Sequence, residues 1–309
     1  MRLKAGFQQY FETELKVLLQ PLEDYRIGRI RKFKKIQYLV IFLSPFFLVS
    51  LILGKPLYCA IVLLTIIFFE AFAFEHLGKT NRALKLKYKT RILPILIGFV
   101  NTEFKYIPNQ RISKSVFDKS FLFPHEVSKV DGEDFMSFKI GDVEIMFCES
   151  QVYSYGPTSV MFEGIFISAT FNKYFSSKTF IFPEKTTSFF RKLRFKVLGS
   201  SFNVKLEDPE FEREFIVLSD DQVESRYILT TSFMQRILDY KKKLKVEIAF
   251  SFIGNRLYCT IPSSKNLFEP ALFESFMDIN FLMQSYEPIM LYAGLVDDLN
   301  LNLRIWSKQ

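Results

Sequence analysis

Few residues of this chain belong to the types that carry out chemistry, and they rarely gather. The sequence holds two histidines, His76 and His125, so catalysis by histidine has little material. Asp131, Glu133 and Asp134 form one cluster of potential metal ligands, because carboxylates bind divalent cations. Their spacing is not that of a calcium-binding loop, so a solvated turn is the simpler interpretation and a metal-dependent hydrolase the sharper hypothesis.

Cysteine chemistry and cofactor binding find little support either. Cys59 lies in an apolar run, and Cys148 and Cys259 lie far apart in strand-like segments. This pattern is typical of buried free thiols in a reducing compartment, and not of a disulfide framework or a zinc site. The sequence contains no glycine-rich phosphate loop, GxSxG elbow or HExxH motif, so we expect no cofactor, and enzymatic activity has no motif behind it.

The elements that position these residues begin with two long apolar segments, 36–53 and 57–74, separated by Gly54, Lys55 and Pro56. Each segment is long enough for a helix to cross a hydrocarbon core of about 30 Å. Because the backbone must satisfy its own hydrogen bonds in lipid, the sequence predicts a transmembrane helical hairpin over residues 36–75.

Basic residues flank both ends of this hairpin, whereas its turn carries only Lys55. Those before it are Arg26, Arg29, Arg31, Lys32, Lys34 and Lys35, and those after it include Lys79, Arg82 and Lys85. By the positive-inside rule, both termini are expected in the cytoplasm, with the chain crossing the membrane twice and the turn on the outside.

The net charge of +8 divides unevenly along the chain. Residues 1–91 contain 16 Lys and Arg against 6 Asp and Glu, whereas residues 92–309 contain 25 against 27. The basic excess therefore belongs to the membrane-proximal third. This favours contact with anionic lipid headgroups and argues against a nucleic-acid-binding soluble domain.

Four regions follow from these patterns. Residues 1–35 are an amphipathic helix and a basic juxtamembrane segment, 36–75 the hairpin, 76–108 a helical connector and 109–309 a cytoplasmic domain. The amphipathic helix, residues 3–25, either packs on the soluble domain or lies in the membrane interface, and Pro21 is expected to end or kink it. The predicted fold class is α+β, with a largely antiparallel sheet and flanking helices.

Strand and helix patterns in the soluble region can be assigned individually. Strands are predicted at 143–149, 160–171, 179–183, 193–198, 202–206 and 211–219, with a hairpin of 245–253 and 256–261 around Gly254-Asn255. Turns are predicted at Asp131-Gly132, Gly141-Asp142 and Gly156-Pro157. Helices are predicted at 80–107, 231–243 (capped by Thr231 or Ser232), 268–283 and 287–303.

Several short stretches resemble a family of uncharacterised bacterial membrane proteins that are sometimes called galanin-like. They are the two apolar segments, DGEDF at 131–135, FEGIF at 162–166, FNK at 171–173, the block from Leu206 to Leu238, NRLYCTI at 255–261 and LFEP at 267–270. Ser225 and Thr231 depart from the Ala and Pro that this family often has there. The resemblance spans about residues 30–305 and implies the same architecture but no activity.

Two polar features allow a functional interpretation beside a structural one. Glu70 interrupts the second apolar segment and is either an intramembrane ion site or a group paired with Lys79 or with a basic residue before Ile36. Asp220, Asp221, Glu224 and Arg226 are either a turn between strands, with Arg226 paired to a carboxylate, or a surface that binds a partner or ligand.

The leading hypothesis is a membrane-anchored cytoplasmic binding or scaffold protein without enzymatic activity. Its expected partners are the lipid bilayer, an unidentified protein and a second copy of the chain. The alternatives are an oligomeric channel or transporter subunit, with Glu70 and Ser44 facing a pore, and the metal-dependent hydrolase.

Overall fold

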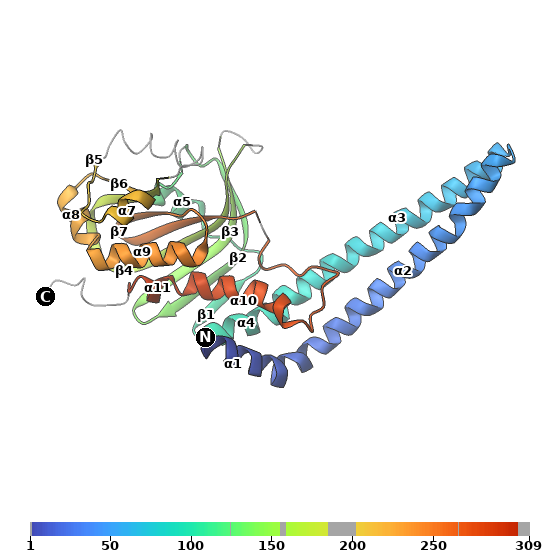
Figure 1. The fold of residues 1–309 in the computed structure, drawn as a ribbon, viewed down its shortest axis with the longest axis horizontal. Coiled ribbons are helices and arrows are strands. Elements are labelled where there is room, and N and C mark those ends of the chain that lie inside the picture. Colours follow the sequence, from blue (N-terminus) through green and yellow to red (C-terminus); the bar gives the residue numbers. More distant parts are fainter. Residues whose placement is uncertain (1, 124, 155–158, 185–201, 265, 302–309) are drawn as a thin grey trace. The chain divides into compact units, whose positions relative to one another are not determined.

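A computed structural model of the protein describes all residues except 1, 124, 155–158, 185–201, 265 and 302–309 (Figure 1). The chain divides into two units. The first, here called the helical unit, comprises Met1–Leu96 and Phe268–Ser285. The second, here called the sheet unit, comprises Ile97–Leu267 and Tyr286–Gln309. The predicted strand at 193–198 and the turn at Gly156-Pro157 lie outside the described residues.

Two long antiparallel helices, α2 (Lys16–Ile52) and α3 (Pro56–Lys87), form a hairpin in the helical unit (Figure 1). A tight turn joins them, in which Gly54 adopts a φ of +61° that favours glycine, and Pro56 opens α3. Both helices are long and apolar enough to cross a membrane, and only 6% of each apolar window is buried. The two predicted apolar helices are therefore confirmed.

The helix before the first apolar segment does not end at Pro21. Helix α1 (Arg2–Tyr10) and the π-helical turn η1 (Phe11–Leu15) lead directly into α2, which contains Pro21 in its interior. Leu19 and Leu22 are buried on either side of the proline, so packing offsets the one backbone hydrogen bond that proline cannot make. Phe7, Phe11 and Leu15 of the amphipathic helix are also buried, whereas Leu18 is 51% exposed.

Helix α3 continues through the π-helical turn η2 (Tyr88–Ile92) into α4 (Leu93–Val100). The helix predicted over 80–107 therefore ends at Val100, seven residues early. Residues 104–107, which were predicted to be helical, form strand β1 (Phe104–Ile107) because they pair with β2. In the helical unit, the buried Tyr88 ring stacks on Phe276 and meets the edge of Phe281.

Within the described residues, the sheet unit holds an antiparallel sheet of seven strands, which confirms the α+β fold class. The strand bounds are β1 (Phe104–Ile107), β2 (Lys129–Ile140), β3 (Val143–Tyr153), β4 (Val160–Pro183), β5 (Phe202–Asn203), β6 (Phe215–Ser219) and β7 (Ala249–Pro262). The order is β1-β2-β3-β4-β6-β5, and β7 pairs with β4. Since β3 and β6 pair with different halves of β4 while β7 pairs with both, β7 lies along the opposite edge of β4.

Both faces of this sheet are covered. On one face, Phe166 and Tyr258 pack with Phe117 of α5 (Lys114–Ser120), whose ring centroid lies 4.0 Å from that of Phe166. On the other face, Phe147 contacts Tyr292 of α10 (Ile279–Ala293), and Phe252 contacts Phe233 of α9 (Thr231–Leu244). The abundant phenylalanines therefore supply much of the core on both sides of the sheet.

Several strand predictions were wrong in the same way, because strands that looked separate are continuous. Residues 160–171 and 179–183 belong to one strand, β4, and the expected hairpin at Gly254-Asn255 is a single strand, β7. The register between them shifts at Phe175 opposite Gly254, whose φ is +60°. A bulge of this kind breaks the alternating pattern without reversing the chain, which is why the sequence resembled a turn there.

Other local predictions were also corrected. Asp131-Gly132 lies inside β2 and makes no turn, whereas Gly141-Asp142 joins β2 to β3 as predicted. Residues 211–219 divide into a helix, α7 (Pro209–Glu214), and β6, because Asp208 caps a helix that begins at Pro209. The predicted strand at 202–206 shortens to β5.

The helices near the end of the chain differ more in their bounds than in their existence. Helix α9 is confirmed, but its cap is Thr230, whose Oγ1 accepts from the Phe233 N–H at 3.3 Å. The helix predicted over 268–283 begins only at Ile279, since turns occupy the preceding residues. Pro288 therefore lies inside α10, and α11 (Leu295–Asp298) follows as a separate helix.

Gly164 in β4 offers a direct test of how closely these strands pack. Its φ is +150°, and an added Cβ would lie 2.2 Å from the Ile261 carbonyl oxygen. Because neither backbone can move aside without breaking the β4–β7 ladder, we expect Gly164→Ala to lower the free energy of unfolding by about 2 kcal/mol or more. Chemical unfolding followed by circular dichroism in detergent measures this.

Gly28→Ala in α2 is the matched control, because no atom lies within 4 Å of its added Cβ. It should be neutral or stabilise the chain by up to about 1 kcal/mol. Equal effects of the two substitutions would contradict the proposed strand packing.

Candidate functional site

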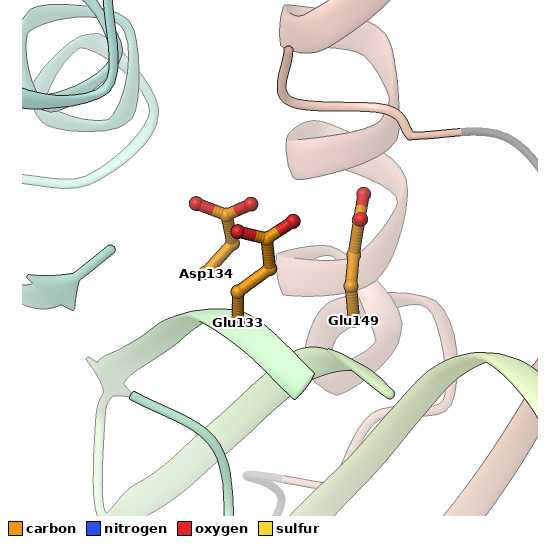
Figure 2. Close-up of side chains that lie close together, drawn as sticks. All are labelled: Glu133, Asp134 and Glu149. Atoms are coloured by element: carbon orange, nitrogen blue, oxygen red, sulfur yellow. The ribbon is translucent and has the colours of Figure 1, made fainter. Parts of the chain in front are cut away.

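Three carboxylates meet on one face of the sheet at a bulge in β2 (Figure 2). Glu133 lies opposite Glu149 of β3, and the register then shifts before Met136. Asp134 occupies the shift with a φ of +57°, held by its N–H bond to the Pro108 carbonyl at 2.8 Å. The bulge therefore brings two consecutive residues beside Glu149, and ligand oxygens of all three lie within 4.8 Å of one another.

Specific donors hold this cluster in place. The Tyr106 hydroxyl donates to Asp134 Oδ1 at 2.6 Å, and the Leu267 N–H donates to Glu149 Oε1 at 2.8 Å. Asp134 is fully buried. Burial and the neighbouring Asp134 carboxylate raise the pKa of Tyr106 far above its usual range, so the hydroxyl keeps its proton and remains a donor.

The cluster borders a cleft of about 300 Å³ between β2, β3, β4 and the segment after β7. Its lining includes Glu133, Glu149, Glu163, Gln151 and Asn266. Three carboxylates at this spacing are hard oxygen ligands of the kind that Mg²⁺ and Ca²⁺ use. The arrangement can therefore hold a divalent cation or a cationic group.

Of the three acids that the sequence grouped as potential ligands, Glu133 and Asp134 lie in this cluster and Asp131 does not. Asp131 lines the same cleft, but its carboxylate binds Lys129 Nζ at 2.5 Å and it is not a member of the cluster. Glu149 replaces it, from a strand that sequence spacing alone could not align with β2. The signal that could have found it was the pairing of two strands across the Gly141-Asp142 turn.

The buried thiols are not suited to nucleophilic attack. Burial raises the pKa of Cys148 to about 12, and burial also raises the pKa of Cys259 well above its usual range. The Cys148 sulfur accepts a hydrogen bond from the Ile112 N–H at 3.4 Å. All three cysteines are free thiols, as expected for structural residues.

The polar block around Glu224 is not a turn between strands. It forms the start of helix α8 (Gln222–Ile228), in which Asp221 is the N-cap and accepts from the Val223 and Glu224 N–H groups. Asp220 Oδ1 accepts from the Lys178 N–H at 2.6 Å. Arg226 was expected to pair with a carboxylate. Within the described residues, it donates to the Lys205 carbonyl at 3.4 Å.

Glu224 fastens α8 to the bend of β4. Its carboxylate accepts from the Ser177 N–H at 2.7 Å, from the Ser176 N–H at 3.2 Å and from both serine hydroxyls. Burial acts to raise the pKa of Glu224, but the hydrogen bonds from Ser177 and Ser176 outweigh it and hold the pKa below its usual range.

Glu70 pairs across the hairpin, although not with the expected partner. Its Oε2 accepts from Gln37 Nε2 at 3.0 Å, whereas Lys79 binds Glu75 at 2.6 Å. Near the turn, Ser50 Oγ and Cys59 Sγ lie 3.1 Å apart. Both polar contacts join α2 to α3, which is what a structural role for Glu70 requires.

The predicted membrane-surface cations fall into two groups. Arg31, Lys32, Lys34, Lys35, Lys79 and Arg82 are exposed. Arg26 is buried against Glu23, Lys85 pairs with Glu269, and Arg29 lies over the Tyr25 ring with 5.0 Å between its Cζ and the centroid. Arg26 and Lys85 are thus engaged within the protein.

Comparison with known proteins adds a family of unknown function. Residues 160–301 match the family model described as "Protein of unknown function (DUF3137)", in agreement with the resemblance to an uncharacterised family. No curated protein matches the chain. Among solved structures, the mycobacterial trehalose monomycolate transport factor A, TtfA, is similar at 9% identity and a TM-score of 0.36, covering 68% of this chain and 97% of its own. A TM-score of 0.36 supports no conclusion about this chain.

The lowered pKa of Glu224 makes a prediction about stability and pH. A depressed pKa stabilises the fold above the ordinary carboxyl pKa and loses that contribution as the pH falls through the folded value. We expect Glu224→Gln to lower the free energy of unfolding at pH 7 by about 1–3 kcal/mol. Urea unfolding followed by circular dichroism should show this difference shrinking below about pH 4.5.

Glu144→Gln is the control for this measurement, because the Glu144 side chain is exposed on β3. It should change stability little at any pH. A Glu224→Gln deficit that stays constant between pH 7 and the acid limit would show that the hydrogen bonds to the ionised carboxylate are not what stabilises α8.

Proposed function

We propose that the chain is a membrane-anchored cytoplasmic binding or scaffold protein, with α2 and α3 as a two-helix anchor. The observation that carries this proposal is the bare apolar surface of the hairpin. Phe42, Phe46 and Ile52 of α2 are 64%, 52% and 83% exposed, and Leu64 and Phe68 of α3 are each 65% exposed. A continuous apolar surface of this extent is unfavourable in water and matches the hydrocarbon interior of a bilayer.

The charge distribution supports an orientation for this anchor. Exposed cations flank the outer ends of the hairpin, from Arg31 to Lys35 on α2 and at Lys79 and Arg82 on α3, and the turn holds Lys55. The positive-inside rule then places both ends of the chain, and the whole sheet unit, in the cytoplasm. The exposed cations would contact anionic headgroups at the cytoplasmic surface.

A binding role for the sheet unit follows from how its polar groups are used. Asp221 caps α8 and Glu224 accepts hydrogen bonds from β4, whereas Val223 and Tyr227 on the same helix are 78% and 43% exposed. The surface left to meet a partner is therefore apolar and aromatic, with Arg226 beside it. Such composition is common at the centres of protein interfaces.

Topology can be tested by thiol labelling of intact cells. In a Cys59→Ala background, Lys55→Cys should react with a membrane-impermeant maleimide added outside, because Lys55 is exposed and the proposed orientation puts the turn on the far side of the membrane. Val223→Cys should react only after the cells are permeabilised. Cys148 and Cys259 are buried and serve as an unreactive background. Labelling of Val223→Cys in intact cells, or of neither position, would contradict the proposed orientation.

Binding can be tested by photo-crosslinking in intact membranes. A photoreactive phenylalanine at Val223 should capture a defined product, either another polypeptide or a second copy of the chain, and Arg226→Glu should reduce the yield several-fold. The matched control is the same probe at Lys114 of α5, on a different part of the sheet unit. Equal products at both positions would show only random collisions and contradict a binding surface on α8.

A further inference from the structure

The segment that follows β7 is held by both helices of the hairpin at once. Phe268–Ser285 is separated in sequence from Met1–Leu96 yet belongs to the same unit. We call Phe268–Ser285 the latch. Residues 268–278 of the latch form turns and irregular structure, so their position depends on contacts with neighbouring elements more than on secondary structure of their own.

Helix α2 holds the latch through a buried ion pair. Arg26 binds Glu23 through two nitrogens, at 2.6 and 2.9 Å, and both residues are nearly inaccessible, at 7% and 4% exposed. The remaining capacity of the pair goes to the latch: Glu23 accepts from the Ser275 hydroxyl at 2.8 Å and the Phe276 N–H at 3.1 Å, and Arg26 donates to the Leu272 carbonyl at 3.2 Å. The pair is therefore satisfied only while the latch is in place.

Helix α3 and its continuation hold the same segment from a second direction. Glu269 of the latch binds Lys85, and Lys89 lies 3.9 Å from its other oxygen. The Tyr88 ring stacks on Phe276, with centroids 6.1 Å apart, and its hydroxyl donates to the Ser285 hydroxyl at 3.0 Å. Phe276 is thus fixed by its backbone to α2 and by its ring to the η2 turn after α3.

The chain connects the latch directly to the sheet unit. Helix α10 runs from Ile279 to Ala293, and the division between the two units falls within it, after Ser285. Pro288 lies three residues beyond, where it removes a helix hydrogen bond and favours bending. Farther along, Tyr292 packs on Phe147, and the Leu291 carbonyl accepts from the Tyr240 hydroxyl at 3.1 Å.

We propose that the latch senses the spacing of α2 and α3 next to the membrane and transmits it to the sheet unit through α10. Because each helix supplies separate contacts to one segment, a change in their spacing must break one set. The buried Glu23–Arg26 pair then loses its partners, which makes latch release a two-state event. The device needs only the hairpin geometry, so its test is independent of membrane insertion.

Hydrogen exchange measured by mass spectrometry on the full chain in detergent tests this device. Glu23→Gln keeps the side-chain shape but weakens its bonds to Arg26, Ser275 and the Phe276 N–H. We expect amides across 269–293, including those beyond Pro288, to exchange about tenfold faster or more. Exchange in β3 should stay unchanged, which separates latch release from global unfolding.

Three further variants sharpen the result. Glu75→Gln removes an exposed ion pair with Lys79 on the same hairpin and should leave exchange in the latch unchanged. Ser275→Ala removes the hydroxyl that donates to Glu23 and should accelerate exchange about two- to fivefold, which keeps the test available if Glu23→Gln does not fold. Lys85→Met, which acts from α3, should accelerate the same amides, and its combination with Glu23→Gln should give less than the product of the two effects.

Two outcomes would overturn the proposal. Faster exchange confined to Phe276 and its neighbours would show the loss of single hydrogen bonds and no cooperative latch. Faster exchange that ends at Ser285 would show that the latch opens without affecting the rest of α10.

Discussion

The sheet unit depends on the uninterrupted pairing of β4. This strand runs from Val160 to Pro183 and is the common partner of β3, β6 and β7. Along one edge, β4 pairs with β7, and the register of this pairing is irregular at Phe175 and Lys178. Along the other edge, β4 pairs first with β3 and then with β6. The same bend provides the Ser176 and Ser177 groups to which α8 is fastened. Strand pairing, sheet curvature and the placement of α8 therefore share one structural cause.

A different constraint governs the helical unit, where the chain cannot cover its own apolar surface. The hairpin leaves most of its large side chains bare, and both of its helices are long and apolar enough to cross a bilayer. Just before the first apolar segment, by contrast, the side chains of the helical unit are well packed, and Glu23 and Arg26 are buried. A buried ion pair adds little net stability compared with apolar packing. Its value here is specificity, because its remaining bonds fit one conformation of residues 272–276.

Features set by local patterns could be predicted from the sequence, and features set by distant pairing could not. The two apolar helices, α9 and the Gly141-Asp142 turn follow from periodicity, capping and turn chemistry within a few residues. The single strand β7 was mistaken for a hairpin, because Gly254-Asn255 has the composition of a turn and only its partner strand reveals a bulge. The helix predicted from Phe268 failed for a related reason: contacts with α2 and α3 hold that segment in turns.

The carboxylate cluster shows the same limit at the level of the site. Glu133 and Asp134 were visible as neighbours, but Glu149 joins them only through the β2–β3 register. Asp131 lies two residues earlier on β2, opposite Gln151, and its carboxylate binds Lys129. Tyr106 and Leu267, which supply the donors, come from two further segments. A site assembled from four segments is specified by the fold and not by a motif, so the absence of a motif in this sequence says little about what its cleft can bind.

The acidic residues of the polar block at 220–226 form hydrogen bonds within the protein. Charged residues close together in sequence suggest a surface that recognises something, yet here Asp220, Asp221 and Glu224 are acceptors for the protein's own backbone. Next to Glu224 on the same short helix, Val223 is 78% exposed. Large apolar groups at such positions cost free energy in water unless another surface covers them. The charged residues of this region thus hold it in the fold, and Val223 between them stays exposed.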